Sequence, residues 1–159
     1  RIFGDVATDT GLVSDLAVEI NAENNWWGCN AGPADEACLD ITGLVDADPW
    51  LVLTFTADQT KLIPGGVIHL TANLSRNSAG ADTSALGSVM DGVLVTFDTT
   101  YGTLNPLSAS LVNASAATTL SVPAPVTVTS ATVSALFDNQ VVEIIFGGQS
   151  YIFLPIISR

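Results

Sequence analysis

Basic residues are scarce in this chain. Lys and Arg together number four, against sixteen Asp and Glu, so the net charge is −12. A nucleic-acid-binding surface needs basic side chains that neutralise phosphates, so we expect no nucleic-acid partner. The same shortage disfavours an anionic membrane surface, and the longest apolar run near an end, residues 151–157, is too short to span a bilayer. We therefore expect no membrane insertion.

Residues that commonly carry catalysis are also sparse. His69 is the single histidine, and it falls in an expected strand, where a solvent-facing role is the simplest interpretation. The sequence contains neither a Ser/His/Asp grouping in family-like surroundings nor a Gly-rich phosphate loop. We expect no enzyme, no catalytic residue and no bound cofactor.

Carboxylates are nevertheless numerous in residues 1–50. Two of them suffice for glycoside hydrolysis, but basic residues that would stabilise developing charge are nearly absent. Calcium is chemically reasonable because hard cations prefer carboxylate oxygens. Without EF-hand spacing, carboxylates solvated in turns are the simpler interpretation, so we expect no metal site. The calcium alternative rests on Asp46 and Asp48, or on the group Asp5, Asp9 and Asp15.

The two cysteines, Cys29 and Cys38, form an isolated pair with Gly32-Pro33 between them to turn the chain back. Zinc would need more ligands, and a C-x-x-C redox motif is absent. We predict a local disulfide, with two buried free thiols as the alternative. A disulfide implies an oxidising compartment, so the expected location is extracellular, at the cell surface. Arg1 opens the chain as though it had been processed or excised.

Short apolar segments separated by turn residues dominate the sequence after residue 50. Ile68, Leu70 and Leu74 alternate with polar residues, which predicts a strand with one buried face. Residues 75–90 read as a long polar loop, and no stretch shows a capped helical period. This spacing is typical of an all-β sandwich. Strands are expected over residues 51–57, 67–74, 93–97, 107–112, 116–122, 131–137, 141–146 and 151–157.

Residues 10–52 carry a distinctive passage, Asn24-Asn25-Trp26-Trp27-Gly28-Cys29, followed by Gly32-Pro33 and Pro49-Trp50-Leu51. It resembles the last coils of secreted right-handed parallel β-helix repeat proteins. The resemblance implies that Trp26, Trp27 and Trp50 pack as a cap over the open end of the solenoid. A sugar-stacking platform that binds cell-surface glycans is the alternative.

Residues 55–147 resemble bacterial immunoglobulin-like domains of the invasin and intimin type. The matching segments are Pro64-Gly65-Gly66 and residues 92–97, 102–104, 116–120 and 131–137. The family often has Asn-Gly before its small-residue strand, whereas this chain has Asn113-Ala114, which indicates a different turn. The resemblance implies a rigid spacer or adhesive stalk unit with no catalytic residues.

Residues 151–159 form an apolar tail around Pro155. This tail resembles the endings of many secreted bacterial proteins. One interpretation is the last strand of the same sandwich. The other is a strand donated to a neighbouring copy, with Gly147-Gly148 as the hinge. The expected assembly residues are Tyr151, Ile152, Phe153, Leu154, Ile156 and Ile157.

These observations predict three parts: a β-helix end cap over residues 1–52, an immunoglobulin-like sandwich over 53–148 and an apolar tail strand over 149–159. The expected function is non-enzymatic and structural, as a subunit of a cell-surface filament, pilus-like fibre or sheath built from copies of itself. The alternative is the non-catalytic C-terminal part of a secreted adhesin or polysaccharide-degrading β-helix enzyme. Asn73 and Asn113 stand in glycosylation sequons.

Overall fold

The computed structural model describes residues 10–147, and its elements are strands apart from one 3₁₀ turn, η1 (Ser84–Leu86). The all-β prediction is confirmed. No helix among these residues is long and apolar enough to cross a membrane. The strands are β1 (Thr10–Val13), β2 (Ile20–Asn21), β3 (Asp40–Thr42), β4 (Val45–Asp46), β5 (Leu51–Ala57), β6 (Val67–Asn77), β7 (Leu94–Thr99), β8 (Thr103–Asn105), β9 (Ser108–Ser110), β10 (Ser115–Ser121), β11 (Ser130–Phe137) and β12 (Gln140–Gly147).

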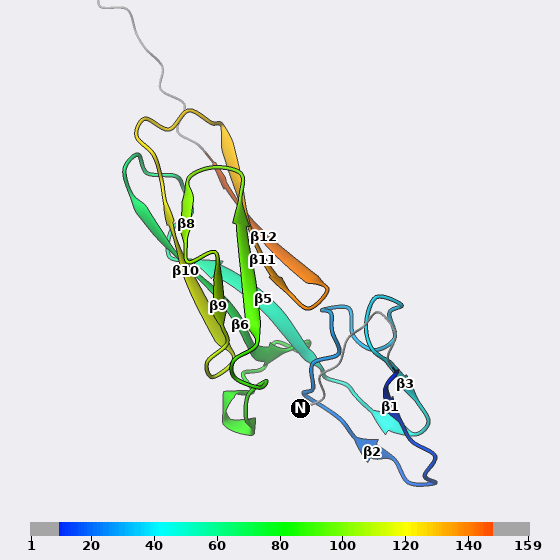
Figure 1. Ribbon diagram of the computed structural model, residues 1–159. Helices are drawn as coiled ribbons and strands as arrows, with labels where there is room; N and C mark the ends of the chain where they lie inside the picture. The colour runs from blue at the N-terminus through cyan, green and yellow to red at the C-terminus, as the bar shows by residue number, and fades with distance from the viewer. Residues whose placement is uncertain (1–9, 148–159) are drawn as a thin grey trace, which may run out of the picture.

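Strands β5 to β12 form a sandwich of two antiparallel four-stranded sheets, ordered β5-β6-β10-β8 and β12-β11-β7-β9. The first sheet has the A-B-E-D order of immunoglobulin domains, and β12-β11-β7 has their G-F-C order. Figure 1 shows the two layers packed along their length. The strand order itself therefore identifies an immunoglobulin-like sandwich, as the sequence predicts.

Alternating side chains build the core between the sheets. Ile68, Leu70 and Leu74 of β6 are all buried, and His69 between them is exposed. On the facing sheet, Val133 and Phe137 of β11 are fully buried. Because successive strand residues point to opposite faces, this period of two assigns one face of each strand to the core. The predicted alternation is confirmed in both strands.

The segment predicted as a long polar loop is shorter and more ordered than expected. Strand β6 continues to Asn77, and η1 follows. The backbone N–H and the hydroxyl of Thr83 both donate to the carbonyl oxygen of Ser75, at 2.7 and 3.1 Å. Val89 is buried in the sandwich core. One buried threonine and one buried valine thus anchor a segment whose composition is otherwise typical of a loop.

The connection between β7 and β10 also differs from the prediction. A single strand was expected over residues 107–112, but two three-residue strands, β8 and β9, pair with opposite sheets. Leu104 of β8 and Leu111 after β9 are both buried. Pro106 lies between the two strands and cannot donate to a ladder, which separates them. The chain therefore changes sheets at this proline.

The N-terminal lobe, defined here as residues 10–50, contains two short parallel pairs. Strand β1 pairs with β3, and β2 pairs with β4 in the register Ile20↔Val45. No parallel β-helix is evident within the described residues. Of the predicted solenoid end, these residues show only the two short parallel pairs. The physical reason is length, because a solenoid needs about three stacked repeats to bury a continuous core.

The predicted tail strand and its assembly residues Tyr151 to Ile157 lie outside the described residues, as do Asp5 and Asp9. The three-part division of the chain stays a prediction. Figure 1 places the N-terminal lobe at one end of the elongated sandwich, beside the turn that joins β11 and β12. Strand β12 runs from that turn toward the opposite end.

Candidate functional site: the junction of lobe and sandwich

A disulfide joins Cys29 and Cys38, whose Cα atoms lie 5.1 Å apart. Both half-cystines are buried in a small second core together with Trp27 and Leu39. The loop that they close is folded by a hydrogen bond from the Asp35 N–H to the Gly32 carbonyl and by another from the Cys38 N–H to the Asp35 carbonyl, each 3.0 Å. The disulfide therefore staples a lobe with little apolar core of its own.

The three tryptophans do not pack together as one cap. Trp26 belongs to the sandwich core, whereas Trp27 is buried in the small core of the lobe. Trp50 is half-buried against that small core, and its indole N–H donates to the Asn30 carbonyl at 2.9 Å. Trp26 and Trp27 are adjacent in the chain but enter different cores, a separation that the sequence analysis did not predict.

Trp26 anchors the lobe in the sandwich. Its side chain is fully buried and packs against the Phe137 ring at a centroid distance of 5.6 Å. Its indole N–H donates to the Asp138 carboxylate at 2.8 Å, in the turn between β11 and β12. Trp26 was expected to plug the end of a solenoid, but it is a core residue of the sandwich.

Sugar stacking on the Trp26-Trp27 pair is excluded by burial, because both side chains are 0% exposed. Aromatic platforms for ligands need an open ring face, which neither residue offers. The indole N–H of Trp27 is buried and has no hydrogen-bond acceptor among residues 10–147. The glycan-binding alternative built on this pair is therefore wrong.

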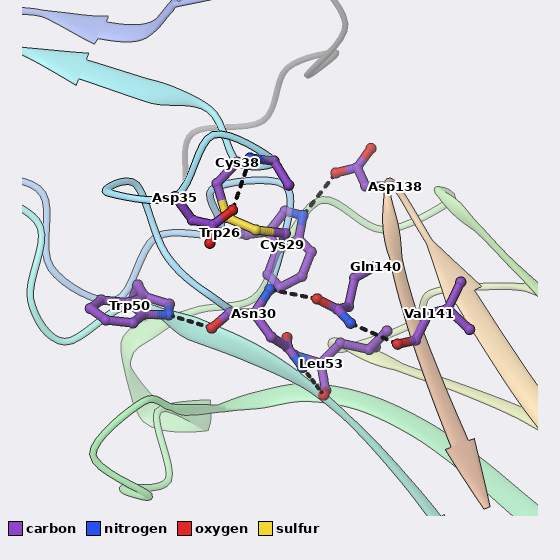
Figure 2. Close-up of a disulfide and its surroundings, with 11 residues drawn as sticks. Trp26, Cys29, Asn30, Asp35, Cys38, Trp50, Leu53, Asp138, Gln140 and Val141 are labelled. Atoms are coloured by element: carbon purple, nitrogen blue, oxygen red, sulfur yellow. Dashed lines mark hydrogen bonds between the residues drawn. A yellow bond between two sulfur atoms is a disulfide. The ribbon is translucent and has the colours of Figure 1, made fainter.

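Asn30 is the polar centre of the junction, and sequence reasoning missed it. Its side-chain N–H donates to the Leu53 carbonyl at 2.9 Å, and its side-chain oxygen accepts from the Leu53 N–H at 2.6 Å. Its backbone N–H donates to the Gln140 side-chain oxygen at 2.8 Å. Figure 2 shows Asn30 between Trp50, Leu53 and Gln140. One residue of the lobe thus holds both sheets of the sandwich.

The position of Asn30 follows from the edge of β5. Strand β5 lies at the end of its sheet, and its register with β6 shifts between Val52 and Thr54. The Leu53 backbone therefore faces outward at the irregularity, and an amide side chain supplies a donor and an acceptor that mimic a neighbouring strand. Asn30 covers this edge of the sheet at Leu53.

Further hydrogen bonds surround this centre. The Leu51 N–H donates to the Asn25 carbonyl at 2.9 Å, so β5 begins on a backbone contact with the lobe. Asn77, buried at the end of β6, donates its side-chain N–H to the side-chain oxygen of Asn24 at 2.9 Å. Asn24 adopts a φ of 56°, a left-handed conformation that asparagine tolerates well. The junction is held by apolar burial and directional bonds together.

Replacing Asn30 with alanine should lower the free energy of unfolding by about 1–3 kcal/mol, because the Leu53 N–H and carbonyl lose their partners in a partly buried site. Equilibrium denaturation of the variant would measure the loss. Asn30→Asp is the matched control: it keeps an acceptor for the Leu53 N–H and removes the donor to the Leu53 carbonyl. A stability of Asn30→Ala equal to that of the wild type would show that these bonds do not support the junction.

Among residues 10–147, no group of three or more His, Cys, Asp and Glu side chains lies close enough to hold a metal ion. Asp46 and Asp48 belong to no such group, and Asp5 and Asp9 of the other calcium alternative lie outside the described residues. The pKa of Asp82 is held below its usual value, chiefly by the hydrogen bond that the Ser84 N–H donates to its carboxylate. That bond orders the start of η1.

The two sequon asparagines differ in accessibility. Asn73 is half-buried within β6, and its side-chain oxygen accepts the Ser75 N–H at 2.7 Å. Asn113 is exposed in the turn before β10, where it adopts a φ of 50°. Its own N–H donates to the Asp91 carboxylate at 2.8 Å. Of the two, Asn113 presents its side-chain amide to solvent.

No family model matches the chain, and no curated protein matches it. Solved structures that are similar to part of it include two of intimin. One is a C-terminal 282-residue fragment of intimin in complex with the intimin-binding domain of the translocated intimin receptor (Tir), at 22% identity over 60% of this chain and 32% of that chain, with a TM-score of 0.45. The other is the D0-D1 domain of intimin, at 21% identity over 69% of this chain and 55% of that chain, with a TM-score of 0.44.

This chain therefore spans about a third of the first of these structures and about half of the second. The immunoglobulin-like architecture rests on its own strand order.

Proposed function

We propose that this chain is a non-enzymatic structural module of an extracellular, cell-surface protein, in which the sandwich is a rigid spacer. The observation that carries the proposal is the linear path of the chain. The N-terminal lobe lies at one end of the sandwich, and β12 runs away from it toward the other end (Figure 1). A module of this shape transmits position and force between whatever precedes the lobe and whatever follows β12.

Rigidity at the junction supports the spacer role. Domains linked by small polar contacts move relative to one another by default. Here Trp26 is buried in the sandwich core, and Asn30 bonds to both sheets. Bending at this point would expose a tryptophan and break several hydrogen bonds at once.

The lobe is proposed to be the last part of a parallel β-helix. The support is the pairing of β1 with β3 and of β2 with β4, in which the paired residues Ile20 and Val45 are 25 positions apart. The connecting turns also stack, because a Cβ at Gly43 would meet the Ser14 carbonyl oxygen. Repeats of about this length that lie directly on one another are typical of solenoids.

Extracellular location is tested by labelling intact cells of the native source with an antiserum raised against the sandwich. Surface labelling without permeabilisation is expected, because a disulfide-stapled module belongs in an oxidising compartment. An antiserum against a cytosolic protein serves as the control on the same cells. Labelling that requires permeabilisation would contradict the proposal.

Self-assembly into a filament is a second candidate function, with the apolar tail as the donated strand. The specific observation in its favour is the outer edge of β12, which pairs with no further strand among residues 10–147. A head-to-tail contact that does not close by rotation produces a filament. Electron microscopy of native material should show regular filaments or sheets, and deleting residues 150–159 should abolish them. Filaments that survive the deletion would contradict a role for the tail.

A further inference from the structure

Strand β12 forms the outer edge of its sheet, and β11 is the only strand that pairs with it in the part of the chain that the structure describes. The Gly147 carbonyl accepts the Leu62 N–H at 3.3 Å, and the Val141 carbonyl accepts the Gln140 side-chain N–H at 2.7 Å. Both carbonyls therefore face away from β11. Backbone groups of every second residue point to the same side of a strand, so those of Glu143 and Ile145 also face outward.

Other segments contact the outer edge of β12 at its two ends but not between them. Gln140 is tied to the lobe through Asn30, and Gly147 is bridged to Lys61. Within residues 10–147, the outward backbone groups of Glu143 and Ile145 have no hydrogen-bond partner. We call residues 141–145 of β12 the open edge.

Apolar side chains surround the open edge. Val141 and Ile145 are 47% and 69% exposed on the outer face of the sheet. Phe55, Val142 and Ile144 pack on the sandwich core but stay only half-buried where the two sheets approach each other. An added strand would bury this seam and satisfy the outward backbone groups at the same time.

The other three sheet edges are either short or partly covered. The β5 edge is covered at its start, where Leu51 bonds to Asn25 and Leu53 bonds to Asn30 at the irregularity. Strands β8 and β9 are each three residues long, which is a common way to blunt an edge. By contrast, β12 is eight residues long and carries exposed Val141 and Ile145. An exposed apolar edge of this length is a site for strand addition.

We propose that the open edge accepts an extended strand formed by residues 151–157 of a second copy of this chain. The inference rests on the proposed assembly function and specifies its acceptor. The donor segment supplies six apolar residues around one proline, and it follows Gly147 after only three intervening residues. Strand addition of this kind takes its affinity from main-chain hydrogen bonds and its specificity from alternate side chains.

The same chain is poorly placed to fill its own open edge. If the chain turned back directly after Gly147 and paired with β12 as an antiparallel strand, it would meet Lys61 and Leu62. These two residues already occupy the edge at Gly147. To pair with β12 as a parallel strand, the tail would first have to reach back to Val141, about 20 Å along β12. The four Cα–Cα steps from Gly147 to Tyr151 span at most about 14 Å. A second copy has neither restriction, because its residues 151–157 are not tied to the Gly147 of the acceptor.

Pro155 fixes which backbone groups of the donor face the acceptor. Proline lacks an N–H, so its position must point away from β12. Alternation then directs the backbone groups of Ile152, Leu154 and Ile156 toward the open edge. The backbone groups of Tyr151 and Phe153 point away together with Pro155.

The test measures binding of a labelled peptide of residues 148–159 to the full chain at a concentration where the chain is dispersed. Saturable binding is expected, and Ile145→Pro should weaken it about tenfold or more, since it removes an outward donor. Proline at this position spares the ladder to β11. Ile145→Thr, which keeps the N–H, is the matched control, and Glu143→Pro repeats the test if Ile145→Pro fails to fold.

Two peptide variants distinguish strand pairing from nonspecific apolar adhesion. N-methylation of Leu154 should abolish binding, whereas N-methylation of Phe153 should leave it nearly unchanged. Equal binding of both peptides, or wild-type affinity in both proline variants, would overturn the inference. A full chain that stays monomeric at every concentration would also overturn it. Native filaments that are unaffected by the proline variants would refute this acceptor while leaving the proposed assembly function standing.

Discussion

Replacing Trp26 with alanine is expected to lower the free energy of unfolding by about 3–5 kcal/mol, the typical cost of emptying a buried tryptophan site. The side chain is fully buried, and it packs on Phe137. Its loss also leaves the Asp138 carboxylate without the indole donor. Equilibrium denaturation of the purified variant measures the change.

Trp26→Phe is the matched control for this prediction. It keeps an aromatic ring against Phe137 and removes the N–H that bonds to Asp138. Its expected loss is smaller, about 1–3 kcal/mol, since a hydrogen bond to a charged group and part of the ring volume are lost. A loss below about 1 kcal/mol in Trp26→Ala would be typical of a surface site and would contradict its role as the anchor of the lobe.

Removal of the disulfide is expected to cost about 2–3 kcal/mol in the chain-entropy model for a loop of this length. Cys29 and Cys38 are nine positions apart in the sequence. The double variant Cys29→Ala with Cys38→Ala tests this by denaturant titration. Because both half-cystines belong to the small core with Trp27 and Leu39, the lobe should lose most of the stability.

Reduction of the wild-type protein provides the control for that experiment. The reduced protein and the double variant should unfold at similar denaturant concentrations, since both lack the same cross-link. Hydrogen exchange should report earlier opening of β3 than of β6, because β3 lies in the lobe and β6 in the sandwich core. A reduced protein with unchanged stability would show that the staple contributes nothing to the lobe.

The sandwich could be predicted largely from the sequence because its signals are local. The alternation through Ile68, Leu70 and Leu74 assigns a strand and its buried face without reference to any other segment. Turn residues such as Asp91-Gly92 and Asp138-Asn139 separate the strands where the structure also has turns. The disulfide was predictable for the same reason, since two cysteines flanking Gly32-Pro33 are near neighbours in the chain.

The junction was not predictable because its partners are remote. Trp26 and Asp138 are 112 positions apart, and Asn30 and Gln140 are 110 apart. An asparagine in a Gly-rich passage reads as a turn residue, and only the folded arrangement brings it to the irregular edge of β5. The separation of Trp26 from Trp27 into two cores was not predicted, because the resemblance to a solenoid cap favoured one shared cluster.

The sequence by itself determined that this protein is all β, that its sandwich strands bury one face, and that its cysteines lie close enough to pair. These properties depend on spacing along the chain, because the alternation of apolar and polar residues in a strand can be read directly from the order of residues. Tertiary structure decided which edge strands are closed and which one remains open. Edge protection depends on contacts between distant segments, such as Asn30 on β5 and Leu62 at the end of β12, and no local pattern encodes them.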